Sequence, residues 1–246
     1  MSAPVPAPAP VPASFRFPTG WLATDLGSHR PCEFTYEVYP LESLPSLDSV
    51  RLDGGFGWLG PESGPEPGHG ERLAALEAEL APLGLRLPAD FRTFYGSGSL
   101  CRAFDEVSVT ACWSDLSGAL RSPVEEGARL VRFLRDQQDC VIWYLYLRPS
   151  GETFVVCSHL DLELAPDMAL AEQEPSAAQA ADFRAAAAES LVRCASTFEE
   201  FAYRFVVENE LWMHLNTTNQ GVALAPHLQE YLDHYAASVG SAANSG

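Results

Sequence analysis

Three residues that could do nucleophilic chemistry stand at alternate positions, namely Cys157, His159 and Asp161. If the strand predicted just before them continues, all three side chains share one face of it. A thiol, an imidazole and a carboxylate are the groups of a cysteine nucleophile with its base and orienting acid. Such partners usually come from different elements, however, and residues two apart on a strand lie about 6–7 Å apart with parallel side chains. The spacing therefore favours a structural role, and an enzyme that uses Cys157 and His159 is kept as an alternative.

A glycine pattern of the dinucleotide-binding kind spans Gly55 to Gly60 (GFGWLG). In a dinucleotide site these glycines open a helix whose N-terminus holds the pyrophosphate. Here Pro61 follows at once, and residues 61–70 (PESGPEPGHG) predict a loop because Pro and Gly recur too densely for a helix. A glycine-rich turn is the better interpretation of this motif.

The histidines and cysteines of the sequence do not have the spacing of a known metal site or of a reactive thiol pair. His227 and His234 are seven residues apart on a predicted helix, with no further zinc ligands nearby. The sequence holds no HExxH or GxSxG motif. Its six cysteines form no CxxC pair and follow no secretory signal, which predicts reduced thiols and a cytoplasmic location. We therefore expect no catalytic residue, no metal and no cofactor.

The charge of the chain is strongly acidic. It holds 33 Asp and Glu against 15 basic residues, a formal net charge of −18 in 246 residues. Nucleic acid and anionic lipid headgroups repel such a chain, so we expect neither as a partner. No apolar run reaches the roughly 18 residues that a membrane-spanning helix needs. A basic protein partner is favoured instead.

The densest acidic stretch runs from residue 161 to residue 174 and contains no basic residue. It predicts a mobile loop whose field is not cancelled by neighbours in the sequence. We expect a basic partner to contact this loop and a nearby edge through Asp136, Asp139, Asp161, Glu163, Asp167, Glu172 and Glu174.

Periodic spacing of apolar residues predicts the elements that must position these groups. Residues 1–14 alternate Pro and Ala and predict a disordered tail, and residues 15–70 form a mixed N-terminal extension with a strand at 34–39. Helices are predicted at 71–80, 88–96, 197–215 and 226–237, strands at 107–113, 130–134, 140–147 and 153–157, and a flexible tail at 238–246. A helix, then consecutive strands, then helices is the order of an α+β domain. We expect a single α+β domain with a mainly antiparallel sheet, flanking helices and an extended N-terminal region.

Two sets of apolar side chains should fill the core. Phe91, Phe94, Phe198, Phe201 and Trp212 fall on stripes at helical spacing, and Val141, Trp143, Leu145, Phe154 and Val156 belong to predicted strands. Ser196 to Glu199 (STFE) is a capping box, which predicts that the helix at 197–215 begins there.

Several of these segments together resemble the SUKH superfamily, an α+β domain of fungal cell-wall-synthesis regulators and many bacterial immunity proteins. Residues 87–94 (LPADFRTF) are similar to the family's LP-x-[DE]-[FY]-R-x-F element, and residues 196–201 (STFEEF) to its S-x-F-x-E-F entry into the last helix. Between them lie the strand block at 130–147 and a hairpin strand that ends at residue 158. The resemblance covers roughly residues 71–215, and residues 96–99 (GSGS) depart from the family's commoner Asn-Gly-Gly.

The resemblance implies a cytosolic binding protein without chemistry of its own. An immunity protein or related adaptor would bind and neutralise a polymorphic nuclease or deaminase toxin, and the acidic charge suits such a basic partner. A regulatory or scaffold protein with another partner is the alternative.

Overall fold

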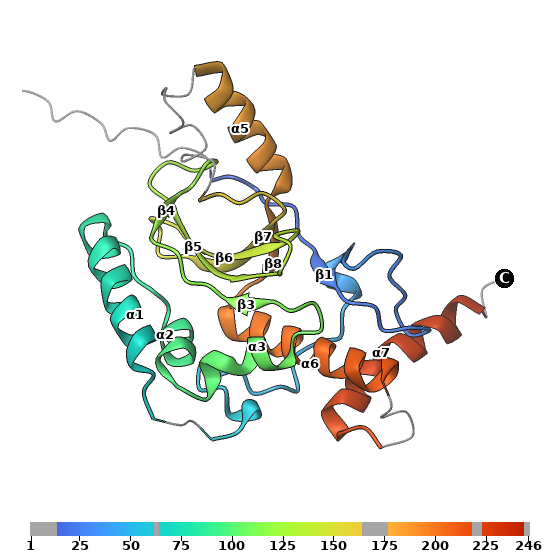
Figure 1. Ribbon diagram of the computed structural model, residues 1–246. Helices are drawn as coiled ribbons and strands as arrows, with labels where there is room; N and C mark the ends of the chain where they lie inside the picture. The colour runs from blue at the N-terminus through green and yellow to red at the C-terminus, as the bar shows by residue number, and fades with distance from the viewer. Residues whose placement is uncertain (1–13, 62–63, 164–176, 218–222, 244–246) are drawn as a thin grey trace, which may run out of the picture.

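The computed structural model describes residues 14–61, 64–163, 177–217 and 223–243. Most of the predicted Pro/Ala tail lies outside these ranges, as do Asp167, Glu172 and Glu174. A six-stranded sheet in the middle of Figure 1 carries helices on both faces, and a two-stranded sheet lies beside it. The predicted α+β domain with a mainly antiparallel sheet is confirmed.

Every pair of neighbouring strands in the main sheet is antiparallel. The order is β3-β5-β6-β7-β8, with β4 also beside β5. The bounds are β3 Trp113–Ser114, β4 Leu120–Arg121, β5 Arg129–Arg135, β6 Ile142–Leu147, β7 Thr153–Ser158 and β8 Val192–Ala195. The three central strands follow one another in the chain through short turns, so Leu145 lies opposite Val131 on one side and Val155 on the other. The strands predicted at 130–134, 140–147 and 153–157 are confirmed.

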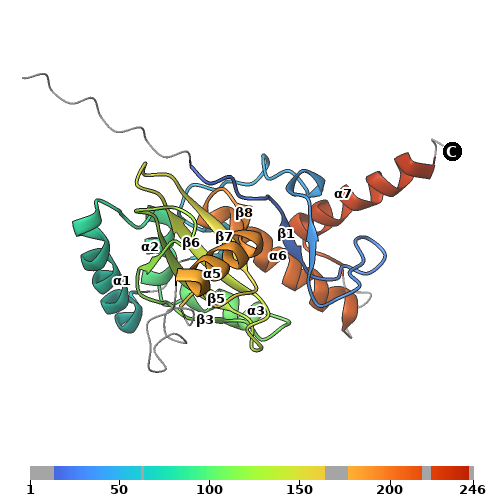
Figure 2. The same cartoon turned by 90° about the horizontal axis from the view of Figure 1, so that it is seen from above.

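The sheet is buried on both faces because helices cover each one. α1 (Pro67–Leu80), α2 (Ala89–Gly96), α3 (Ala103–Val107) and α6 (Phe198–Asn216) pack on one face, and α5 (Ala177–Ser190) packs on the other (Figures 1 and 2). Val141, Trp143 and Leu145 contribute to the larger core on the α6 side, whereas Phe154 and Val156 pack beneath α5. All five predicted strand residues are therefore buried.

The N-terminal extension continues the sheet. Gly20 donates its N–H to the Arg193 carbonyl oxygen at 3.1 Å, which attaches the start of β1 (Trp21–Ala23) to β8. β1 pairs in turn with β2 (Glu37–Tyr39), so the predicted strand at 34–39 exists only in its second half. Upstream, Phe17 packs edge-on against Tyr146 on the α5 face, with 4.9 Å between ring centroids.

A third apolar cluster joins the extension to the C-terminal helices. Leu26 lies buried between α6 and α7 (Pro226–Ala243), where it contacts the cluster of Tyr203, Val207, Leu211, Leu228, Tyr231, Leu232 and Tyr235. α7 is longer than predicted, because its helix runs through part of the segment expected to be a flexible tail. Short 3-10 helices occupy Leu41–Ser43, Gly57–Leu59, Ala81–Leu83 and Leu100–Arg102.

The strand predicted at 107–113 is wrong. Its first residue ends helix α3, and only Trp113 belongs to a strand. A tight turn lies between them: Ala111 has a φ of 52°, and the Cys112 N–H donates to Ser108 Oγ at 2.8 Å. Val109 donates its N–H to Asn209 Oδ1 of α6, so side-chain contacts override the local strand propensity.

Two helix starts also differ from expectation. α1 begins at Pro67 inside the predicted loop, because proline suits the first turn of a helix and the glycines after it are tolerated there. The N-cap of α6 is Thr197, whose Oγ1 accepts the Glu200 N–H at 3.1 Å. Glu200 in turn accepts the Ser196 N–H at 2.9 Å, so the capping box lies one residue later than predicted.

Because Glu200 takes the place predicted for Glu199 in the capping box, the Glu199 carboxylate can bind another segment. Its buried carboxylate accepts the N–H of Gly54 at 2.5 Å, the N–H of Phe56 at 3.0 Å and the Trp58 indole N–H at 3.2 Å. The glycine motif is therefore a turn that a carboxylate binds to α6, and it contains a short 3-10 helix instead of opening an α-helix.

Trp212 is the one predicted core aromatic that is not buried. It lies half-exposed in α6, whereas Phe91, Phe94, Phe198 and Phe201 are buried. Successive helical residues are rotated by about 100°, and it is Leu211 that turns into the cluster with α7.

Candidate binding groove

An open groove of about 750 Å³ lies where β6 begins, β7 ends and β8 begins. The segment before and within β2 forms its opposite wall, and the end of α5 borders it. The lining residues are Leu22, Glu33, Phe34, Thr35, Tyr36, Val38, Cys140, Val141, Cys157, Ser158, His159, Glu189, Ser190 and Val192. This groove is a concave site that could take a ligand or a partner.

Apolar side chains form much of the groove. Val38 lies against Gly20 so closely that a Cβ at Gly20 would stand 2.6 Å from Val38 Cγ1. The same Cβ would lie 3.5 Å from Val192 Cγ1, so Gly20 lets the wall from β2 approach β8. Val38 remains 57% exposed and Phe34 remains 69% exposed on the open side.

The wall that carries these side chains is anchored to the sheet. The Tyr36 hydroxyl hydrogen-bonds to Thr110 Oγ1 at 2.6 Å, and the Tyr36 ring lies edge-on to Trp143 with 6.0 Å between centroids. Burial raises the pKa of Tyr36 well above its usual range, so the hydroxyl stays neutral. The groove is thus preformed on this side.

The polar rim of the groove is acidic. Glu33 and Glu189 are exposed at it, and the lining contains no arginine. Neither carboxylate forms an ion pair with any residue in the described part of the chain. Beneath the rim, Ser158 Oγ and Ser190 Oγ hydrogen-bond at 2.8 Å and join β7 to the end of α5.

The groove also contains the Cys157 and His159 of the sequence motif, but they do not form a nucleophile with its base. Cys157 is buried and its thiol donates to the Val192 carbonyl oxygen at 3.6 Å, while His159 is exposed. Asp161 contacts arginine instead of imidazole. Burial holds the pKa of the neighbouring Cys194 thiol well above its usual range, which keeps that thiol un-ionised.

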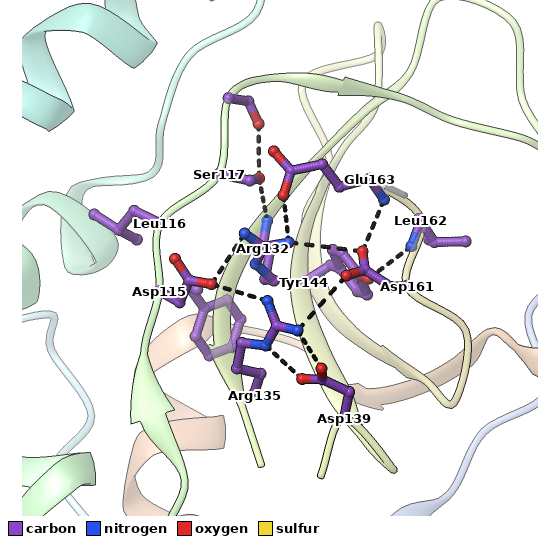
Figure 3. Close-up of polar contacts among 12 residues, drawn as sticks. Asp115, Leu116, Ser117, Arg132, Arg135, Asp139, Tyr144, Asp161, Leu162 and Glu163 are labelled. Carbon is purple, nitrogen blue, oxygen red and sulfur yellow. Dashed lines mark hydrogen bonds and ion pairs between the residues drawn. The ribbon is translucent and has the colours of Figure 1, made fainter. Parts of the chain in front are cut away.

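Three of the acidic residues predicted to bind a partner, Asp139, Asp161 and Glu163, lie around two arginines of β5 (Figure 3). We call Arg132, Arg135 and the carboxylates that they contact the arginine cluster. Arg132 contacts Asp115 at 3.0 Å, Asp161 at 3.6 Å and Glu163, and is itself 6% exposed. Arg135 binds Asp139 at 2.5 Å, Asp115 at 3.2 Å and Asp161 at 3.7 Å.

The arginine cluster corrects part of the sequence interpretation. Arginines partly cancel the electrostatic field of Asp139, Asp161 and Glu163, because each of these carboxylates contacts one. Asp136 is buried, and its Oδ1 accepts the Cys140 N–H at 2.7 Å and so closes the β5–β6 turn. Asp167, Glu172 and Glu174 lie outside the described residues. That these seven residues contact a partner stays a prediction.

Sequence reasoning missed the groove because its lining comes from six separate segments. Val141 and Cys157 belonged to predicted strands, and Phe34 and Val38 to a short one, but no strand was predicted at Val192 and nothing in the spacing brings these residues together. The two arginines were visible in the predicted strand at 130–134 and beside it. Only the pairing of that strand places them next to Asp161.

No metal-binding group of three or more His, Cys, Asp or Glu side chains is found among the residues that the structure describes. None of the described helices is long and apolar enough to cross a bilayer. No protein-family model matches the chain, and no curated protein or solved structure matches it at a significant level.

Proposed function

We propose that this chain is a protein-binding module without chemistry of its own, which captures a basic partner domain in the cytoplasm as an immunity protein does. The observation that carries the proposal is an apolar groove whose rim carboxylates form no ion pair within the described residues, on a chain with a net charge of −18. Exposed Phe34 and Val38 supply apolar area to bury against a partner. The resemblance to the SUKH superfamily names the partner class, a secreted nuclease or deaminase toxin.

Charge supports the proposal physically. Sites that bind nucleic acid are basic, so a toxin of the nuclease class presents the field that this chain complements. Opposite fields raise association rates by about 10–10³-fold over neutral encounter. A protein that must intercept a toxin quickly gains from this effect.

An enzyme built on Cys157 and His159 is less well supported, because the buried thiol and the exposed imidazole are not joined by a hydrogen bond in the described structure. The Cys157→Ser variant separates the two proposals. Binding that survives the substitution supports a module without chemistry, whereas an activity that the substitution abolishes supports the enzyme.

The proposal predicts that nuclease or deaminase toxin domains are encoded near this gene, and purified domains of this kind test it. The chain is mixed with each domain at 0.15 M salt, and size-exclusion chromatography with light scattering measures the complex. We expect a stoichiometric complex that abolishes the nuclease or deaminase activity of one domain. Cytochrome c, an unrelated basic protein, is the control and should elute separately. Failure to bind or inhibit any of the toxin domains would overturn the proposal.

A further inference from the structure

We infer that the groove, and not the arginine cluster, is the contact site, and that it takes a partner segment in which apolar side chains are flanked by arginine or lysine. The inference rests on the proposed function and adds to it a location and the chemistry of the bound segment. Three features of the groove carry it: its exposed apolar side chains, its anchored wall and its unpaired carboxylates.

Exposed apolar side chains gather at the groove. Among the described residues, five large hydrophobic side chains are markedly exposed: Phe34, Val38, Leu83, Trp113 and Met213. The last three belong to three separate elements and do not line the groove. Single exposed hydrophobic residues are ordinary, whereas neighbouring ones that share a concavity indicate a binding surface. Phe34 and Val38 are the pair that meets this description.

Because the wall is anchored, the groove can bind a partner segment without any change from a disordered to an ordered wall. Tyr36, between Phe34 and Val38 in sequence, is tied to Thr110 at 2.6 Å, and Val38 rests on Gly20. A preformed site loses little conformational entropy on binding, so the apolar area that it buries contributes to affinity. The partner segment then needs apolar side chains to cover Phe34 and Val38.

The carboxylates of Glu33 and Glu189, which form no ion pair within the described residues, favour a positively charged partner segment. Glu33 and Glu189 border the groove without an arginine in its lining, whereas Asp139, Asp161 and Glu163 already contact Arg132 or Arg135. An ion pair with a partner would have to displace those internal contacts at the arginine cluster but not at the groove. Arginine and lysine also have apolar stems that cover a hydrophobic surface while their charged ends reach a carboxylate.

A defined peptide probes the groove directly. The probe is a fluorescent heptapeptide that alternates arginine with apolar residues (RVRFRVR), and its acidic counterpart (EVEFEVE) is the control. Anisotropy titrations of the full chain measure both affinities, and methyl NMR locates the contact. We expect the basic peptide to bind more tightly and to shift the methyl signals of Leu22, Val38 and Val192. Equal affinity for both peptides, or shifts that avoid these methyl groups, would overturn the inference.

Matched variants test the two chemical features separately. Phe34→Arg places a cation on the exposed apolar surface and should weaken binding of the basic peptide by about tenfold or more. Glu33→Gln with Glu189→Gln should weaken it several-fold, and less at high salt. The controls are Met213→Arg and the pair Glu42→Gln with Glu126→Gln, exposed positions outside the groove, which should stay within about twofold of wild type. Circular dichroism confirms that each variant is folded, and a folded Phe34→Arg variant with wild-type affinity would contradict the inference.

The same variants against a toxin domain separate the two proposals. If the wild-type chain captures a toxin domain and Phe34→Arg captures it equally well, the groove inference fails and the proposed function stands. If the wild-type chain binds the basic peptide through the groove but no toxin domain, the proposed function fails and the groove inference stands.

Discussion

Glu208 shows how one buried carboxylate can hold three parts of the chain together. It accepts hydrogen bonds from the Trp21 indole at 2.8 Å, from Arg30 at 2.6 and 2.7 Å and from the Tyr231 hydroxyl at 2.8 Å. Burial disfavours the charge of Arg30, but Glu208 more than offsets this and raises the pKa of the guanidinium. The guanidinium therefore keeps its charge, and the ion pair attaches the N-terminal extension to α6 and α7.

Removing Arg30 should cost far more than removing an exposed arginine. Arg30→Ala leaves Glu208 buried without its counter-ion, so we expect a loss of about 3–5 kcal/mol in the free energy of unfolding. The matched control is Arg102→Ala, whose pair with Glu106 is exposed and should contribute less than about 1 kcal/mol. Urea denaturation followed by fluorescence measures both. Equal midpoints for the two variants would contradict the structural role of the pair.

The thiols should differ sharply in reactivity. Cys140 is exposed, whereas burial raises the pKa of Cys101 and Cys112 and raises the pKa of Cys32 to about 11. Because the thiolate is the reactive form, iodoacetamide at pH 7.5 should label Cys140 first, and raising the pH to 9 should leave Cys32 mostly unlabelled. Mass spectrometry of the digested protein reads out each site, and early labelling of Cys101 or Cys112 in folded protein would be inconsistent with their burial.

At the scale of elements, α6 is the helix on which the main core depends. Phe198, Phe201 and Phe205 form one stripe against the sheet, and the ring of Phe201 lies 5.2 Å from Phe133 and 6.1 Å from Trp143 between centroids. Helical spacing alone predicted that Phe198 and Phe201 lie on this stripe, since apolar residues at three- and four-residue intervals share a face. The same spacing failed at Trp212, because Leu211 and not Trp212 packs in the cluster with α7.

Truncating Phe201 should destabilise the whole domain. Phe201→Ala removes a fully buried ring and leaves a cavity, so the free energy of unfolding should fall by about 3–5 kcal/mol. Met213→Ala on the same helix is the control, because that side chain is 43% exposed and should change stability little. Chemical denaturation compares the two. A Phe201→Ala protein with the wild-type midpoint would show that the ring is not part of the core.

The arginine cluster should restrain the chain that leaves β7. The Leu162 N–H donates to the Tyr144 hydroxyl at 3.0 Å and the Glu163 N–H to Asp161 Oδ1 at 2.9 Å, next to Arg132. Arg132→Leu removes the counter-ion of Glu163 and one of the two that contact Asp161, so we expect faster hydrogen exchange at the amides of Leu162 and Glu163. Arg121→Leu, at an exposed position of β4, is the control and should leave both rates unchanged. Unchanged exchange in Arg132→Leu would mean that the cluster does not hold this segment.

For the whole molecule, local patterns predicted the three central strands, the main helices and the fold class, but neither β8 nor the site. Val141, Trp143 and Leu145 stand at alternate positions of one strand, so their side chains share a face of the sheet. Their burial could therefore be predicted from a short stretch of sequence. The groove and the arginine cluster depend on contacts between residues far apart in sequence, such as Val38 with Gly20 and Val192, or Arg132 with Asp161. Strand pairing brings these residues together, and spacing along the chain does not encode it. Composition alone gave the acidic net charge. It did not show which carboxylates form ion pairs with arginine.

The central claim is that an acidic groove captures a basic partner, and the association rate constant tests it most directly. Stopped-flow fluorescence with a toxin domain should give a rate that falls steeply as salt rises, because the field is screened over about 8 Å at physiological ionic strength. Glu33→Gln with Glu189→Gln should lower the rate at low salt, while the control pair Glu42→Gln with Glu126→Gln should slow it less. An association rate that is indifferent to salt and equal in all three proteins would contradict the account.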